Sequence, residues 1–181
     1  MSSDLEAATR GADRTAARGT MRFDRFATGV LYVVAFALGA VSRAQDDLWW
    51  LLRAGSDIWR TGHVSLVERY SFTADGRYWS NHEWLWEAVA YALHHVGGMP
   101  LLSAWTGATV LATVWVVRRS TTASGYVVPL VLGAALPLMS VSWTTRPQVT
   151  SMLLFAVMVL LLIRERYAWI PPLFLLWNRK L

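Results

Sequence analysis

The chain of 181 residues has the length of one soluble domain, but 55% of its residues are hydrophobic and only 16% are charged, which excludes an ordinary soluble composition. The formal net charge is +5, and the basic residues lie mainly beside apolar blocks, as membrane topology requires, so no nucleic-acid partner is expected. Because the chain has no cysteine, disulfides, thiolate metal sites and cysteine nucleophiles are excluded.

The first 25 residues are polar and show no apolar periodicity, which predicts a disordered tail over residues 1–25. Arg22 and Arg25 stand directly before the first apolar block. Basic residues that flank a membrane span stay on the cytoplasmic side, so the N-terminus is expected to be cytoplasmic.

Uncharged apolar blocks fill much of the remaining chain. As helices they would be about 24–29 Å long, close to the roughly 30 Å hydrocarbon core of a bilayer. The sequence therefore predicts an all-α, multi-pass protein of the plasma membrane with about four to five transmembrane helices. We assign these helices to residues 26–43, 99–117, 127–143, 149–163 and, as a partial span, 168–178.

Residues 44–97 are expected to form an extracytoplasmic loop that contains two interfacial helices. Asp46 or Asp47 can cap the first of them, in which apolar residues recur at helical spacing up to Trp59. Gly62 is expected to end this helix, and the Asp75-Gly76 pair predicts a turn. The second helix, Glu83 to His95, is short and carries acids and histidines, so it is expected on the membrane surface.

Positive charge supports this topology. If Glu83 to His95 does not cross the membrane, Arg118, Arg119, Arg164 and Arg166 all lie on the cytoplasmic side. The final apolar run, Ala168 to Trp177, would span only about half a bilayer. The chain is therefore expected to be the N-terminal part of a longer protein.

Four phrases in this order resemble the opening of the C-fold (GT-C) polyprenyl-phosphate-dependent membrane glycosyltransferases, in an uncharacterised bacterial branch. The phrases are QDDLWWLLRAG (Gln45–Gly55), SLVERYSFT (Ser65–Thr73), WSNHEWL (Trp79–Leu85) and TRPQ (Thr145–Gln148). Two departures from the family wording are Leu51, where a histidine is expected, and Glu68-Arg69, where aspartate and proline would stand.

The resemblance implies transfer of a sugar from a lipid-linked phosphate donor to an unknown acceptor at the outer membrane face. Such a reaction needs a carboxylate base, for which Asp47 is the first candidate and Asp46 the second, and a cation for the leaving phosphate. Arg146 is the first candidate for that cation and Arg53 the second, while Glu68, His82 and Glu83 are candidates for sugar or acceptor contacts.

Each of these residues has a structural alternative. The acidic pair and His82-Glu83 can be helix caps, and Arg146 can form a salt bridge to an outer acid or contact a lipid head group. Asp46 and Asp47, with Glu68, could also bind a divalent cation such as Mg²⁺ or Mn²⁺. At the level of function, the alternatives are a non-catalytic or truncated membrane homologue and, less favoured because the spans carry few polar residues, a small transporter.

Overall fold

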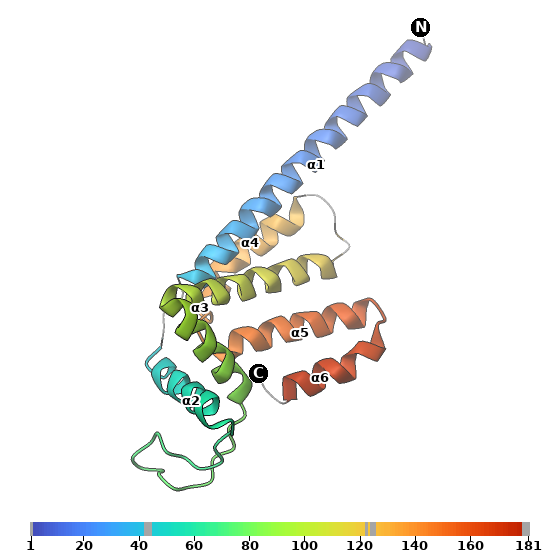
Figure 1. Ribbon diagram of the computed structural model, residues 1–181. Helices are drawn as coiled ribbons and strands as arrows, with labels where there is room; N and C mark the ends of the chain where they lie inside the picture. Colours follow the sequence, from blue (N-terminus) through green and yellow to red (C-terminus); the bar gives the residue numbers. More distant parts are fainter. Residues whose placement is uncertain (1, 42–44, 122, 124–125, 179–181) are drawn as a thin grey trace.

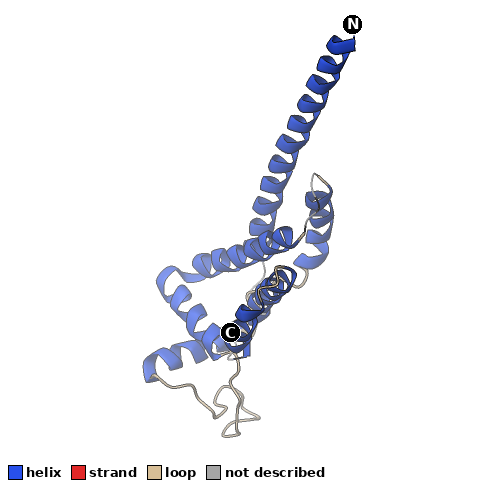
Figure 2. Cartoon of the chain, turned by 90° about the vertical axis from the view of Figure 1, so that its right-hand side faces the viewer, coloured by secondary structure: helices blue, strands red, loops and turns tan. Residues whose placement is uncertain are grey.

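The chain is all-helical, as the sequence predicts (Figures 1 and 2). The computed structural model describes residues 2–41, 45–121, 123 and 126–178, and 75% of it is helix, with no strand in these ranges. The expected boundary between first span and outer loop, at residues 43 and 44, lies outside the described residues. The helices are α1 (Ser2–Ala40), α2 (Leu48–Thr61), α3 (Trp84–Ser120), α4 (Val127–Ser140), α5 (Pro147–Ile163) and α6 (Ile170–Asn178), with a short 3-10 turn at Tyr167–Trp169.

Helix α1 is one continuous rod whose N-terminal end projects far beyond the other helices (Figure 1). The expectation of a disordered tail is therefore wrong for residues 2–25. This segment contains no proline and is rich in alanine and arginine, which are good helix formers. The helix propensity of these residues thus extends the apolar helix toward the N-terminus.

Among the described residues, two helices have the length and apolar composition of a membrane span, fewer than the four to five expected. They are Phe23–Ala40 within α1, and α3. Helices α4 and α5 have 14 and 17 residues, which corresponds to only about 21 and 26 Å against a hydrocarbon core of roughly 30 Å. Length and composition therefore suggest membrane association only weakly.

Helix α3 bends sharply at Gly98, where φ is 63° and ψ is −159° (Figure 1). A positive φ with this ψ is accessible essentially to glycine alone, which explains why the chain changes direction here. Residues 84–97 carry Glu87 and two histidines, whereas residues 99–117 carry no charge. Residues 99–117 are the part that is expected to span the membrane, and residues 84–97 are expected to lie outside it. The expected surface helix and the following span are thus two arms of one bent helix.

The second arm of α3 crosses α1 at a pair of glycines. A Cβ built on Gly107 would lie 2.7 Å from the carbonyl oxygen of Phe36, and one on Gly39 would lie 2.9 Å from Gly107 Cα. This close approach brings α1, α3, α4 and α5 around one buried cluster: Leu31, Ala35, Val110, Val114, Leu136, Trp143 and Val149. Small residues at helix crossings are characteristic of membrane-protein packing.

Helix α2 packs its apolar face against the first arm of α3. Leu48, Leu51 and Leu52 are buried there beside Trp86 and Ala90. Trp59 closes the far end of this contact by donating its indole N–H to the Ala88 carbonyl at 2.9 Å. The apolar face predicted to lie in the membrane interface is therefore covered mainly by protein, because α3 offers an apolar surface directly beside it.

Gly55 allows this close packing. A Cβ at Gly55 would overlap the Glu87 carbonyl oxygen and would lie 2.7 Å from the Glu87 carbonyl carbon.

We expect Gly55→Ala to lower the free energy of unfolding by about 2 kcal/mol, because the backbone of α3 cannot move aside without opening the α2–α3 core. Denaturant titration of the detergent-solubilised chain measures this effect. Gly29→Ala is the control, since nothing lies within 4 Å of its added Cβ; an equally stable Gly55→Ala protein would contradict the prediction.

The loop between α2 and α3 is held by turns rather than by a sheet. Gly62 ends α2 in the left-handed conformation, as expected, with its N–H bonded to the Ile58 carbonyl at 2.8 Å. Gly76, with φ 78°, forms the predicted turn. The β-prone runs on either side of it meet in one isolated antiparallel bridge, Val67 to Tyr78.

Charged residues lie at both ends of the helix bundle. At one end, Arg118 lies 3.6 Å from Asp24 of α1, and Arg164 donates to the Arg119 carbonyl at 3.2 Å. The start of the apolar part of α1, the end of α3 and the end of α5 therefore meet. At the other end, α1 finishes near the starts of α2 and α5, and this is where Asp47 and Arg146 lie.

Candidate functional site

The structure joins Asp47 and Arg146, which are 99 residues apart in sequence. The Arg146 Nε donates to Asp47 Oδ1 at 3.1 Å, and Arg146 Nη2 contacts the second carboxylate oxygen, Oδ2. Both side chains are about three-quarters buried, with 27% and 29% of their surfaces exposed. A two-point contact between guanidinium and carboxylate fixes both groups in position.

Local sequence explains how Arg146 reaches this place. Pro147 occupies the first turn of α5, where its missing N–H costs nothing. The residue before a proline favours extended backbone, and Arg146 has φ −143° and ψ 162°. The arginine side chain is thus turned away from the axis of α5 and toward the start of α2.

Asp47 occupies the N-cap position of α2, but its side chain makes no capping hydrogen bond. The cap considered as an alternative role for Asp47 is therefore not formed, because the carboxylate is turned to Arg146 instead. The salt bridge considered as an alternative for Arg146 is the contact observed. Asp46 lies beside the pair and is exposed.

An open groove of about 850 Å³ surrounds this ion pair. Asp46, Asp47 and Arg146 supply its charges, and Trp143 and Val141 are among the apolar residues on its walls. The groove lies where α1 and α4 end and where α2 and α5 begin. It therefore combines a carboxylate, a cation and an apolar wall at one end of the helix bundle.

Arg53, the second candidate for phosphate contact, lies apart from this groove. Its Nε donates to Asp57 Oδ2 at 3.3 Å, one turn further along α2, and Asp57 also pairs with Arg60 at 2.9 Å. Arg53 does not line the groove that contains Arg146. The structure therefore does not bring the two candidate arginines together.

Glu68 closes a turn in the loop. Its Oε1 accepts hydrogen bonds from the backbone N–H groups of Tyr70 at 2.6 Å and Ser71 at 2.9 Å. It does not line the groove with Asp46 and Asp47, so the three-carboxylate cation site considered from sequence is not assembled. Within the described ranges, no group of three or more histidine, aspartate or glutamate side chains could hold a metal ion.

His82 and Glu83 stand directly before α3, as expected, but away from the groove. His82 Nδ1 lies 3.0 Å from the Ser80 carbonyl oxygen, and Nε2 lies 3.8 Å from Glu83 Oε1. The Glu83 side chain makes no capping bond; instead its backbone N–H donates to Asn81 Oδ1 at 3.2 Å. The structure therefore does not unite these candidates with Asp47.

The sequence analysis did not single out Glu87, the one fully buried acid in the described part of the chain. Asn81 Nδ2 donates to Glu87 Oε2 at 2.7 Å, while Oε1 has no partner among the described residues. Burial raises the pKa of Glu87 from its usual 4.5 to about 7, aided by the nearby charge of Glu83, although the Asn81 hydrogen bond opposes the shift. The sequence signal that could have identified Glu87 is its position on the apolar side of α3, with Trp86 and Ala90.

No protein-family model, curated protein or solved structure matches this chain.

Proposed function

We propose that this chain is part of a multi-pass membrane glycosyltransferase that takes sugar from a polyprenyl-phosphate donor at the extracytoplasmic face. The observation that carries the proposal is the Asp47–Arg146 pair within one groove. A carboxylate that can accept a proton and a cation that can stabilise a phosphate are the two groups the reaction needs. The resemblance of the sequence phrases around Asp47 and Arg146 supports the same assignment.

Competition for Arg146 would couple donor binding to activation of the base. When a donor phosphate contacts Arg146, the guanidinium is shared between the phosphate and Asp47, and the Asp47 carboxylate is partly released to contact the acceptor. Asp47 then takes the proton of the acceptor as the acceptor atom bonds to the anomeric carbon. The anomeric C–O bond breaks, and polyprenyl phosphate leaves with the electron pair beside Arg146.

An apolar groove supplies a path for the lipid chain of the donor. It has a volume of about 590 Å³ and runs along α5 from Gln148 to Val159, with Met139 of α4 and Trp177 of α6 on its walls. Gln148 lies two residues after Arg146 in the first turns of α5. A polyprenyl phosphate needs this combination of a cation near a helix start and an apolar groove along the same helix.

The proposed topology has a cytoplasmic N-terminus and four to five spans. Arg118, Arg119 and Arg164 gather at the end of the bundle opposite Asp47 and Arg146, which agrees with the enrichment of arginine on the cytoplasmic side of membrane proteins. Large apolar side chains also point outward from the short helices, including Leu130, Leu138 and Phe155. Extensive outward apolar surface suits contact with lipid.

A non-catalytic membrane protein is the second candidate. It is favoured by the fact that Asp47 and Arg146 neutralise each other's charge. In that case the pair would only tie the start of α2 to the start of α5. The two functions differ in whether the groove binds a lipid phosphate.

Arg146→Gln tests the proposal. We expect the full chain in lipid nanodiscs to bind polyprenyl phosphate in preference to uncharged polyprenol, and Arg146→Gln to weaken phosphate binding about 10- to 100-fold through loss of a charge-assisted contact. Polyprenol binding should not change, because it depends on the apolar groove. Native mass spectrometry with both lipids measures this difference.

The matched control is Arg77→Gln, which removes an exposed arginine from the loop turn. Each variant is compared with the original chain by size-exclusion chromatography, so that misfolding is recognised. Equal binding of polyprenyl phosphate and polyprenol by the original chain would contradict the proposal and favour the non-catalytic function.

A further inference from the structure

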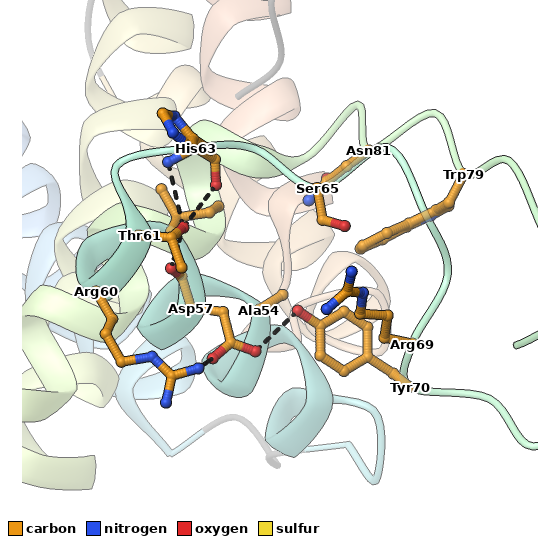
Figure 3. Close-up of a pocket in the computed structure, with 11 residues that line it drawn as sticks. Ala54, Asp57, Arg60, Thr61, His63, Ser65, Arg69, Tyr70, Trp79 and Asn81 are labelled. Carbon is orange, nitrogen blue, oxygen red and sulfur yellow. Dashed lines mark hydrogen bonds and ion pairs between the residues drawn. The ribbon is translucent and has the colours of Figure 1, made fainter. Parts of the chain in front are cut away.

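A second, smaller pocket lies at the other end of α2, between its last turns and the loop (Figure 3). Its volume is about 260 Å³. Asp57 and Arg60 line it from α2, and Arg69, Tyr70, Trp79 and Asn81 line it from the loop. Asp57 follows Asp47 by ten residues, which corresponds to about 15 Å along a helix. The pocket is therefore distinct from the groove around Arg146.

Positive charge is in excess in this pocket. Asp57 is already neutralised by Arg60 at 2.9 Å and by Arg53 at 3.3 Å, on the same helix. Arg69 lines the pocket from the loop and makes no ion pair with any described residue. In Figure 3 its guanidinium points toward the space beside Trp79. A ligand with an acidic group would supply the missing counter-charge.

Aromatic rings form another wall of the pocket. Trp79 and Tyr70 meet edge to face, with ring centroids 5.6 Å apart, and the Trp50 ring packs against Trp79 with its centroid 5.9 Å away. The Tyr70 hydroxyl donates to Asp57 Oδ2 at 3.2 Å, which fixes the position of its ring. Trp79 projects from the loop into the space between Ser65 and Arg69 (Figure 3). A ring held in this way offers an apolar face against which the ring of a ligand can pack.

We propose that this pocket binds an anionic sugar, a hexuronic acid unit, with its ring against Trp79 and its carboxylate on Arg69. The apolar C–H face of a sugar ring suits an indole, and a carboxylate suits a guanidinium. Asp57 and Asn81 add polar atoms to the lining of the pocket. The volume lies just below the roughly 300–1,000 Å³ of pockets for drug-sized ligands, which fits one sugar ring. The site does not depend on the proposed transfer reaction.

Glucuronate, glucose and inorganic phosphate are the probes that test this site. The full chain in detergent micelles is titrated with each by calorimetry and by ligand-observed NMR. We expect glucuronate to bind at least about tenfold more tightly than glucose or phosphate, since each lacks one of the two contacts. Binding of glucuronate no tighter than phosphate would overturn the proposal, because the sugar ring would then contribute nothing.

Two variants test separately how the Trp79 ring and the Arg69 charge contribute to binding. Arg69→Gln should reduce the affinity for glucuronate to that for glucose, while Trp79→Leu should weaken both sugars about tenfold. Arg77→Gln and Tyr78→Phe are controls, because both residues are exposed and neither lines the pocket. Arg69 is exposed, so its variant tests the site even if Trp79→Leu misfolds. Unchanged glucuronate affinity in Arg69→Gln would overturn the assignment.

Discussion

Asp47→Asn is expected to reduce sugar transfer from a polyprenyl-phosphate donor by at least about 100-fold, the contribution of a positioned general base. Donor binding should be retained or become tighter, because Arg146 would no longer be neutralised by a carboxylate. Asparagine keeps the size of the side chain and can still accept a hydrogen bond from Arg146. Loss of label from the lipid donor, when the donor carries a radiolabelled sugar and the vesicles contain the chain, measures the rate.

Asp75→Asn is the matched control, since this aspartate lies in an exposed turn of the loop. Its transfer rate should equal that of the original chain. Asp46→Asn should have a smaller effect than Asp47→Asn, because Asp46 is exposed beside the pair and makes no contact with Arg146. Full activity of Asp47→Asn would rule out this residue as the base, whatever the variant does to donor binding.

The buried carboxyl of Glu87 should make stability fall as pH rises. Its pKa is raised to about 7 in the folded chain, so the folded state holds a proton that the unfolded state has already lost. Below pH 4.5 both states are protonated, and no penalty exists. Between pH 4.5 and about 7 the free energy of unfolding should fall by about 3 kcal/mol, and it should then level off.

Glu87→Gln should remove this pH dependence. Glutamine can accept the Asn81 hydrogen bond with its carbonyl oxygen, and it carries no charge to bury. The variant should therefore match the original chain near pH 4.5 and be more stable at pH 8 by about 3 kcal/mol. Denaturant titrations of both proteins at a series of pH values measure this difference.

Asp75→Asn is again the control, because an exposed carboxylate contributes little to pH-dependent stability. The pH profile of stability for this variant should run parallel to that of the original chain. This result would distinguish the effect of Glu87 from general effects of charge. Glu83 and Tyr70 lie near Glu87 and remain unchanged in both proteins. Identical pH profiles for Glu87→Gln and the original chain would show that the buried carboxyl is not the titrating group.

Helix positions could be predicted well where local chemistry decides them. The apolar spacing after Asp47 predicted α2, and Gly62 ends it as expected, because a helix end in the left-handed conformation favours glycine. The polarity of residues 2–25 predicts disorder, but these residues form helix because alanine and arginine favour it. The bend of α3 at Gly98 was not predicted, because the surface helix Glu83 to His95 and the span from residue 99 are expected from the sequence as two separate helices.

The sequence predicted two residues of the candidate site, but it did not predict which of the candidate residues lie together. Asp47 and Arg146 were both named from sequence phrases, and a salt bridge from Arg146 to one of the outer acids was one of the alternatives. Arg53, Glu68, His82 and Glu83 were named with them, yet their hydrogen bonds are made within the loop or along α2. A phrase in a sequence shows which residue types occur together, but it does not show which side chains face one groove.

The sequence alone determined an all-helical chain with apolar segments, because helical spacing and the run of uncharged residues are local properties. Only the tertiary structure decided which residues are buried together. The glycines at 55, 98 and 107 let helices approach or turn in ways that no local pattern reveals. This packing covers the apolar face of α2, buries Glu87 against it, and joins Asp47 to an arginine 99 residues away.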